Sequence, residues 1–202
     1  IYYLINYNLQ TNNKPNSNNS FNRYGRKYII PLLSNYEISK HVDKLIYKDL
    51  CKKYNIKTFK TLYILKEPSD LYNLYSNLPN SFVIKSNKGS GRNVIIKDKY
   101  IITPEQILKK LENYNHPYNP KTEPQYNYTI PKIYIEEYID PIPPDIKILM
   151  FKNKPKILWI MEDRFNNLKR SIYKFKNNQL IHLPNCYWGH SSTSEKSELL
   201  DE

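Results

Sequence analysis

Two closely spaced glycines constrain the fold of this chain more than any other feature. The chain has only four glycines in 202 residues, and Gly89 and Gly91 both fall in the segment FVIKSNKGSGRNVIIKD, Phe82 to Asp98. Short runs of Val and Ile flank this loop on both sides, a pattern that is typical of two β-strands. The sequence therefore predicts strands over Phe82–Lys85 and Asn93–Lys97, joined by a flexible and cationic loop.

The loop matches neither of two common phosphate-binding motifs. No helix-starting Gly-Lys-Ser/Thr follows it, as a Walker motif requires, and a strand follows where a dinucleotide fingerprint has a helix. A glycine hairpin still lets backbone amides close over a phosphate chain, because glycine adopts positive φ and has no Cβ. Lys85, at the end of the first strand, would then point at the phosphates. The alternative is an ordinary hairpin whose glycines make a tight turn.

The charge of the chain favours an anionic partner. The formal net charge is +12 and the sequence pI is near 9.4, which suits nucleic acid, polyphosphate or an acidic polymer. A coding sequence rich in A and T would also accumulate Lys without any functional pressure. Lys and Arg are spread through every segment and do not concentrate with aromatics, so nucleic acid is the less favoured partner.

From the sequence we expect neither a membrane span nor a signal peptide. It has no apolar run of eighteen residues and no basic-then-apolar leader. Cys51 and Cys186 lie far apart without metal-type pairing, which fits a reducing compartment, so we expect a cytoplasmic location. The chain begins at Ile1, and we expect it to be a segment of a longer product.

Apolar spacing predicts three helices in the first two thirds of the chain. Val42 to Tyr54 carries apolar residues on one helical face, with Ser39 as the expected N-cap. A second, short helix should follow Ser69 or Asp70. Thr103-Pro104-Glu105-Gln106 has the residues of a capping box with Pro at the first helical position, which predicts a third helix start.

Further strands are predicted mainly in the second half, which makes the chain α+β. The segment KIYIEEYI alternates as a strand should, with Pro141 beyond its end. Three more strands are expected over Asp145–Phe151, Lys156–Met161 and Ser171–Phe175, with Asn153-Lys154 as a hairpin turn.

Taken in order, these pieces form five landmarks. They are Asp43-Lys44, Leu78 through Gly91, Ile135 through Ile139, Pro144 through Pro155, and Asp163 through Tyr173. With these landmarks the chain resembles the TupA-like ATP-grasp proteins, a family of teichuronopeptide and polysaccharide biosynthesis. The resemblance covers roughly Leu33 to Leu183.

The resemblance implies an α+β ATP-grasp fold, in which two lobes close on ATP with Mg²⁺. Such proteins activate a carboxylate as an acyl phosphate, which an amine then attacks. We expect an arm over residues 1–40, the first lobe over 41–140, a partial second lobe over 141–190 and a polar tail over 191–202. The expected partners are the nucleotide and an acidic glycan or amino-acid substrate. The fold is expected to be incomplete at the C-terminus.

The resemblance also implies roles for individual residues. The implied nucleotide-binding residues are Lys44, Lys85, Lys88, Gly89, Ser90, Gly91, Glu136, Glu137, Tyr138, Ile139 and Asp145. Lys44 and Lys85 would hold the α- and β-phosphates, while Lys88 to Arg92 would form a lid. The strand from Ile135 to Ile139 would meet adenine and ribose through its backbone and one glutamate. Lys147 and Arg164 would be catalytic, with Arg164 steadying the charge on the transferring phosphoryl group.

Structural alternatives remain open for most of these residues. Lys44 could be a solvated helix cation, and one of Glu136 and Glu137 should face solvent. Asp145 and Lys147 could form a cross-strand surface pair. Arg164 could belong to a structural salt bridge.

No metal ligands are assigned. The family's closing strands should carry an Asp and a Glu for magnesium, and no such strands stand before Glu202. His182, Cys186 and His190 lack a fourth ligand for zinc. Three functions therefore stay open: a carboxylate–amine ligase, a truncated or non-catalytic ATP-grasp module attached to a glycosyltransferase, and a basic module that binds anionic polymers.

Overall fold

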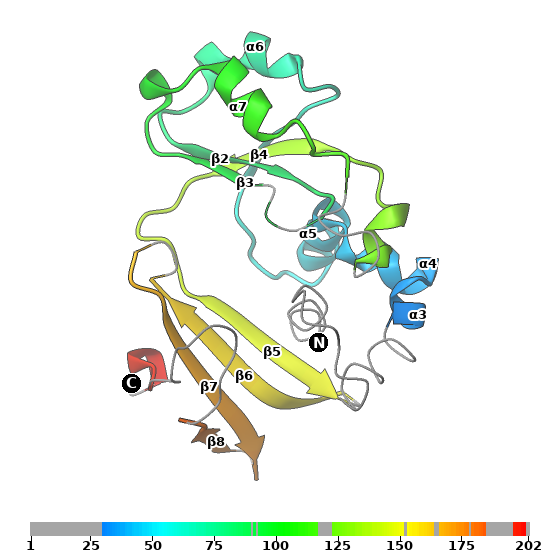
Figure 1. The fold of residues 1–202 in the computed structure, drawn as a ribbon, viewed down its shortest axis with the longest axis vertical. Coiled ribbons are helices and arrows are strands. Elements are labelled where there is room, and N and C mark those ends of the chain that lie inside the picture. The colour runs from blue at the N-terminus through cyan, green and yellow to red at the C-terminus, as the bar shows by residue number, and fades with distance from the viewer. Residues whose placement is uncertain are drawn as a thin grey trace, which may run out of the picture. The chain divides into compact units, whose positions relative to one another are not determined.

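The computed structural model describes residues 30–89, 91, 93–116, 123–151, 153–163, 166–177, 179–184 and 196–200. The described chain forms two compact units, one within Asn8–Tyr138 and the other within Ile139–Glu202. Each unit contains one four-stranded sheet (Figure 1). The fold is therefore α+β, as the sequence predicts, and both sheets are antiparallel.

The first sheet has the strand order β1-β4-β2-β3. Its strands are β1 (Thr61–Ile64), β2 (Phe82–Ser86), β3 (Asn93–Ile96) and β4 (Ile133–Glu137). The glycine loop joins β2 to β3, and Lys85 pairs with Asn93 at the loop end of this hairpin. The two strands predicted around the loop are thereby confirmed, whereas β1 was not predicted.

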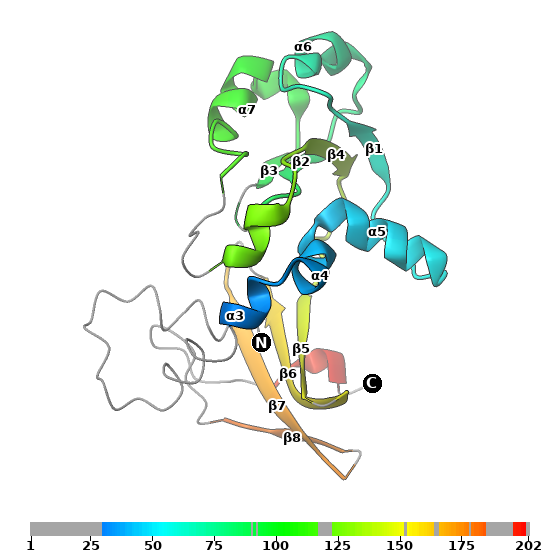
Figure 2. The ribbon, with the colours of Figure 1, turned by 90° about the vertical axis from the view of Figure 1, so that its right-hand side faces the viewer.

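Helices lie on both sides of this sheet (Figure 1 and Figure 2). Above it in the views are α6 (Asp70–Leu74) and α7 (Pro104–Lys110), and on the other side is α5 (Lys44–Lys53). The remaining helical pieces are short: α3 (Ile30–Leu33), α4 (Tyr36–Ser39), η2 (Lys40–Val42), η3 (Tyr75–Asn77), η4 (Lys99–Ile101) and η5 (Pro124–Tyr128).

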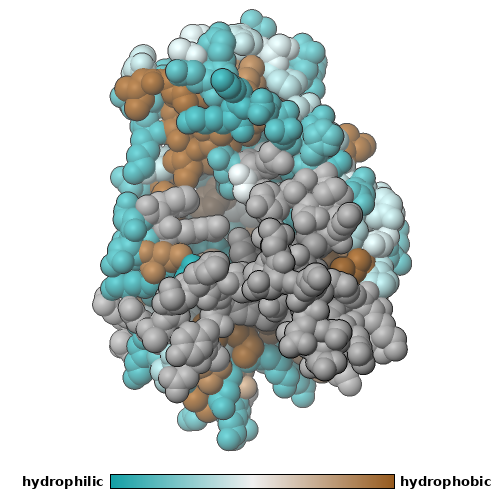
Figure 3. Space-filling model, in the orientation of Figure 1, coloured by the Kyte–Doolittle hydropathy of each residue, from teal (hydrophilic) through white to brown (hydrophobic). Residues whose placement is uncertain are grey.

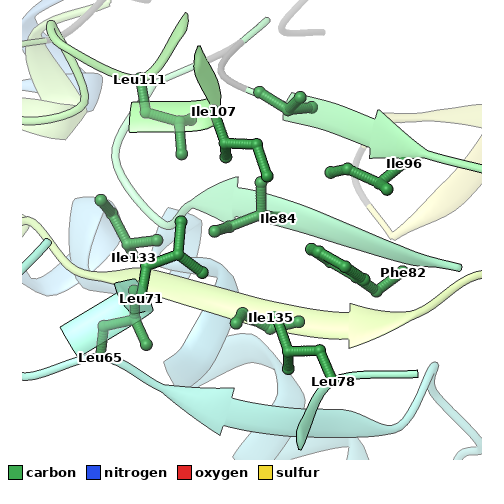
Figure 4. Close-up of a cluster of buried hydrophobic side chains, with 11 residues drawn as sticks. Leu65, Leu71, Leu78, Phe82, Ile84, Ile96, Ile107, Leu111, Ile133 and Ile135 are labelled. Carbon is green, nitrogen blue, oxygen red and sulfur yellow. The ribbon is translucent and has the colours of Figure 1, made fainter. Parts of the chain in front are cut away.

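The core of the first unit fills the space between the sheet and the helices α6 and α7 (Figure 4). Alternate residues of β2 are buried, so Phe82 and Ile84 point into this core. Burying one such side chain contributes about 1.5–3 kcal/mol. The other buried members are Leu65, Leu71, Leu78, Val94, Ile96, Ile107, Leu111, Ile133 and Ile135.

Helix α7 begins as its sequence predicts. The Thr103 hydroxyl accepts a hydrogen bond from Gln106 N at 3.4 Å, and the Gln106 side chain accepts one from Thr103 N at 2.9 Å. This confirms the capping box. Helix α6 also begins at the predicted place, because Asp70 is its first residue.

The predicted N-cap of α5 is wrong. Asp43 is the N-cap, and its Oδ1 accepts hydrogen bonds from Leu45 N at 2.8 Å and Ile46 N at 3.4 Å. Ser39 ends α4 instead, in αR conformation with φ −71° and ψ −29°. An N-cap residue needs the extended backbone that Asp43 has.

The apolar face predicted for α5 is not the face that is buried. Cys51 is the buried residue of this helix, whereas Ile46 and Tyr54 are 44% and 64% exposed. Lys44, Lys48 and Cys51 are spaced by four and three residues, so they share one face. Helix α5 therefore turns a largely cationic face inward, and the next subsection gives the contacts of its lysines.

The second unit contains a four-stranded antiparallel meander, in the order β5-β6-β7-β8. Its strands are β5 (Asp145–Phe151), β6 (Lys154–Glu162), β7 (Lys169–Lys176) and β8 (Gln179–His182). The first three confirm the predicted strands, whereas β8 was not predicted. The predicted turn is misplaced by one residue, because Lys154 pairs with Phe151 as part of the hairpin ladder.

Apolar side chains cover parts of both faces of the second sheet. Leu158, Ile160 and Tyr173 form one cluster, and Trp159, Met161 and Ile172 form the other. A short 3-10 helix, η6 (Glu198–Leu200), follows Ser197, whose N–H donates to the Tyr173 hydroxyl at 2.8 Å.

Apolar side chains form separate groups among hydrophilic ones on the face drawn in Figure 3. Among the described helices, none has the length and the apolar character that a membrane crossing requires.

Candidate functional site

The candidate site lies on the face of the first sheet that points away from the apolar core. Neighbouring side chains of a strand point to opposite faces. Since Ile84 and Ile135 point into the core, Lys85 of β2 and Glu136 of β4 point to the other face. Tyr134 shares this face and is buried, and burial together with the nearby Glu136 raises the pKa of its hydroxyl.

Glu136 is the centre of the charges on this face. Its Oε1 lies 2.5 Å from Lys48 Nζ, and its Oε2 lies 2.5 Å from Lys85 Nζ. Glu136 is only 2% exposed, whereas the side chains of Lys48 and Lys85 are 15% and 22% exposed. The carboxylate is thus buried beneath two cations that reach partly into solvent.

Lys48 is held by further contacts. Its Nζ donates to Thr61 Oγ1 at 3.0 Å and to the main-chain oxygen of Phe59. Lys85 has a different second contact, since its Nζ lies 5.7 Å from the centroid of the Phe59 ring. The segment before β1 therefore borders both lysines.

Lys44 connects helix α5 to the glycine loop. Its Nζ donates to the main-chain oxygens of Ser86 at 2.9 Å and Gly89 at 2.7 Å. Burial removes the ammonium group from water, and the positive charge of Lys85 repels it, so the pKa of Lys44 is lowered to about 8. We call Lys44, Lys48, Lys85 and Glu136 the lysine–glutamate cluster.

The loop glycines are required for conformation. Gly89 and Gly91 have φ values of 85° and 73°, in the left-handed region that favours glycine. A Cβ at Gly91 would meet no atom within 4 Å, so space does not explain this glycine. Lys88 is half-buried, and its N–H donates to Ser86 Oγ at 3.0 Å. Ser90 lies outside the described residues.

Asn87 is a site residue to which the sequence analysis gives no role. It is 1% exposed, and its Nδ2 donates to Asp43 Oδ2 at 2.8 Å and to Ile130 O at 3.0 Å. Its Oδ1 accepts from Lys132 N at 2.7 Å. Asn87 thus fixes the start of α5 against the base of the loop. The only indication of this role in the sequence was the position of Asn87 within the second landmark, Leu78 through Gly91.

The two neighbouring glutamates of β4 have different surroundings. Glu136 belongs to the cluster, whereas Glu137 is half-buried and its Oε1 accepts from Lys60 N at 2.7 Å. This settles the question that alternation left open, since Glu137 is the more exposed of the two. Tyr138 is half-buried and Ile139 is 40% exposed, and the two compact units divide between them.

The second unit brings Asp145 and Lys147 together. They lie two residues apart on one face of β5, and their side chains form an ion pair. Lys147 Nζ also lies 5.6 Å from the centroid of the Trp159 ring. The alternative of a cross-strand pair is therefore wrong, because both partners belong to one strand. Arg164 lies outside the described residues.

The described residues offer no clear metal site. Within the described ranges, no three His, Cys, Asp or Glu side chains gather where they could hold an ion. His182 packs against the Tyr173 ring at 5.2 Å between centroids, while Cys186 and His190 lie outside these ranges. The structure therefore identifies no ligands for the Mg²⁺ that the resemblance implies.

Comparison with known proteins gives a family. The model of the TupA-like ATPgrasp family matches residues 26–198, a span that includes both sheets and the lysine–glutamate cluster. No match to a curated protein or to a solved structure was found. A match of this extent agrees with the α+β architecture and with the order of the landmarks. The chain belongs to the TupA-like ATP-grasp family.

Proposed function

We propose that the chain binds ATP through the lysine–glutamate cluster and the glycine loop. We further propose that it acts as a carboxylate–amine ligase in polysaccharide or glycoconjugate biosynthesis, in the cytoplasm. Membership of the family supports the nucleotide. The substrates, an acidic glycan or amino acid and an amine, are inferred from the resemblance alone.

One observation carries the proposal for ATP binding. Lys44 from α5 and Lys85 from β2 converge at the base of the glycine loop, where burial and then the positive charge of Lys85 lower the pKa of Lys44. Mutual repulsion between ammonium groups has a cost, and a polyanion relieves it. Charge-assisted contacts of this kind contribute about 1.5–3 kcal/mol each.

The other residues are proposed to complete the nucleotide site. The loop from Lys88 to Gly91, Ser90 included, is proposed to close over the phosphates, with the backbone amides of Gly89 and Gly91 as donors, because left-handed backbone is found in anion-binding loops. The segment from Glu136 to Ile139, which begins in β4 and continues beyond its end, would border the adenosine. Asp145 is a proposed nucleotide-binding residue in the second unit.

The chemistry of the proposed reaction is the one that the family resemblance implies. Bound ATP would supply the phosphoryl group that converts a carboxylate into an acyl phosphate, with ADP as the leaving group. Attack by an amine would then form the amide and release phosphate. Lys147 and Arg164 are the proposed catalytic cations, which would offset negative charge on the transferring group.

A thermal-shift titration with a non-hydrolysable ATP analogue and Mg²⁺ tests nucleotide binding. A ligand that binds the folded state stabilises it by RT ln(1 + [L]/Kd), so a competent site should gain about 1 kcal/mol or more at millimolar nucleotide. GTP and CTP analogues serve as comparisons for the base. Absence of any stabilisation would overturn the proposal.

A non-catalytic ATP-grasp module is the second candidate. It is favoured by the absence of a gathered carboxylate set among the described residues, because phosphoryl transfer needs a cation that offsets phosphate charge. Incubation with ATP, Mg²⁺ and mixtures of acidic and amine acceptors, followed by phosphate release, distinguishes the two. Binding of the ATP analogue without acceptor-dependent phosphate release would support the module.

A further inference from the structure

We propose that Glu136 is a built-in counter-anion that sets how strongly, and how selectively, the cluster binds polyphosphates. Its carboxylate occupies Lys48 and Lys85 in the ligand-free protein. This inference rests on the proposed nucleotide site, but it concerns a separate property. It predicts that removing one buried negative charge strengthens anion binding and weakens discrimination between anions.

The Glu136 carboxylate contacts lysines from two different elements. Each oxygen takes one ammonium group, Lys48 from helix α5 and Lys85 from strand β2. Glu136 itself stands on β4, where it pairs with Val83 on one side and Thr61 on the other. The carboxylate therefore holds two cations from different elements on one face of the sheet.

The two lysines differ in how much hydrogen-bonding capacity they retain. Lys48 already donates to Thr61 Oγ1 and Phe59 O. Among the described residues, the Lys85 ammonium group forms an ion pair with Glu136 Oε2 at 2.5 Å and donates no further hydrogen bond. The Lys85 ammonium group thus keeps donors for an incoming anion.

The exposure of the three groups favours a role in ligand binding. The carboxylate is 2% exposed, while the Lys85 side chain is 22% exposed. Partial exposure lowers the desolvation cost of the two ammonium groups and also leaves them open to an anion from solution. The Glu136 carboxylate is buried, whereas Lys48 and Lys85 are accessible. An anion from solution therefore contacts two lysines whose positive charge Glu136 already partly neutralises.

The partial neutralisation of the lysines by Glu136 should affect the affinity for different anions differently. A phosphate chain must compete with the carboxylate for the same ammonium groups, and a close negative charge repels it. A nucleotide gains additional contacts from its base and ribose, whereas inorganic tripolyphosphate does not. We therefore expect Glu136 to disfavour tripolyphosphate relative to the ATP analogue.

The test compares Glu136→Gln with the parent by calorimetry, using inorganic tripolyphosphate and a non-hydrolysable ATP analogue. The variant keeps the shape of the side chain and loses its charge, so tripolyphosphate affinity should rise roughly tenfold or more, with a smaller gain for the analogue. Glu37→Gln is the matched control, because it breaks an exposed Lys–Glu pair in the same unit. It should change neither affinity.

Two further variants, Lys48→Met and Lys48→Met/Glu136→Gln, test the inference if Glu136→Gln alone does not fold. Lys48→Met removes one cation and should weaken tripolyphosphate binding roughly tenfold, whereas Lys52→Met, an exposed residue of the same helix, should not. Lys48→Met/Glu136→Gln restores the net charge and should return the affinity toward the parent value. A merely structural role for Glu136 predicts no such recovery.

The outcomes separate this inference from the nucleotide proposal. The counter-anion role is wrong, and ATP binding stands, if the parent binds the ATP analogue but Glu136→Gln gains no tripolyphosphate affinity over the parent. The same holds if the double variant gains none over Lys48→Met. If the parent binds no analogue while Glu136→Gln gains tripolyphosphate, the cluster is an anion site and the ATP proposal fails. Absence of binding to every variant overturns both.

Discussion

Lys44 Nζ lies 2.7 Å from the main-chain oxygen of Gly89 and donates a hydrogen bond to it. The first residue of helix α5 is thus joined to the first glycine of the loop between β2 and β3. A movement of the loop must break this bond or carry Lys44 with it. The bond therefore couples the position of a candidate phosphate ligand to the conformation of the loop.

The lowered pKa of Lys44 predicts a pH dependence of nucleotide binding. The free protein loses the ammonium proton as the pH rises through about 8, whereas an ordinary lysine keeps it to about 10.4. Affinity for the ATP analogue should be nearly constant near pH 7, should begin to fall as the pH approaches 8, and should fall above it by up to about tenfold per pH unit. Phosphate groups titrate at about pH 6 and do not contribute in this range.

Lys44→Arg supplies the control for this pH profile. Guanidinium keeps its proton throughout the range, so the fall above pH 8 should disappear even if the affinity itself changes. Calorimetry from pH 7 to pH 9.5 measures both profiles. A decline of equal size in the variant would show that another group titrates, and Lys44 would lose its proposed role.

Replacement of Lys85 by Ala should abolish binding of the ATP analogue. The change removes the ammonium group whose donors remain available among the described residues. It also leaves Lys48 as the remaining ion-pair partner of buried Glu136, so the free energy of unfolding should fall by about 1–3 kcal/mol. Equilibrium dialysis measures binding, and urea denaturation measures stability.

Lys110→Ala is the comparison for this variant, because Lys110 is an exposed lysine at the end of α7. It removes the same charge from the same unit and should leave binding and stability unchanged. If folded Lys85→Ala binds the analogue as well as the parent does, the loop is only a turn and the proposed nucleotide site is misplaced.

Substitutions at Gly91 should distinguish the cost of an unfavourable backbone conformation from the cost of a steric clash. The φ of 73° costs an L-residue about 1–2 kcal/mol, while the open surroundings add no clash. Gly91→Ala should therefore destabilise the protein or shift the loop, and Gly91→Val should do so more strongly. Gly91→Asn should be the mildest, because Asn tolerates the left-handed region.

The nucleotide response of these variants should also be graded. Loss of the glycine conformation should weaken analogue binding less completely than loss of Lys85. Thermal shifts with and without the analogue measure this order. Equal behaviour of Gly91→Val and the parent in both measurements would show that the loop does not need its left-handed residue.

Local sequence patterns predict the elements that depend on local interactions. The capping box at Thr103 and the hairpin around the glycine loop follow from residues within a few positions of one another. Strand β1 was missed although Thr61, Tyr63 and Ile64 favour strands, because its four residues show no clear alternation and are ordered by pairing with β4. The inward face of α5 was misjudged for a related reason, since Lys48 turns inward toward Glu136, a residue distant in sequence.

The candidate site was predictable only as a set of residues. The landmarks select Lys44, Lys85 and the pair Glu136-Glu137, but spacing along the chain does not reveal that one carboxylate is shared by two lysines. Nor does spacing show that Asn87 joins the start of α5 to the loop, because that role depends on its hydrogen bond to Asp43. Both features arise from tertiary packing.

Asn87→Ala should be among the more destabilising single changes in the first unit. It leaves Asp43 Oδ2, Ile130 O and Lys132 N without their partner, and an unsatisfied buried polar group costs about 1–3 kcal/mol. The loss should exceed that of Thr103→Ala, which removes an exposed N-cap worth about 1 kcal/mol. Urea denaturation of both variants gives the comparison. If Asn87→Ala costs no more than Thr103→Ala, Asn87 does not fix α5 to the base of the loop.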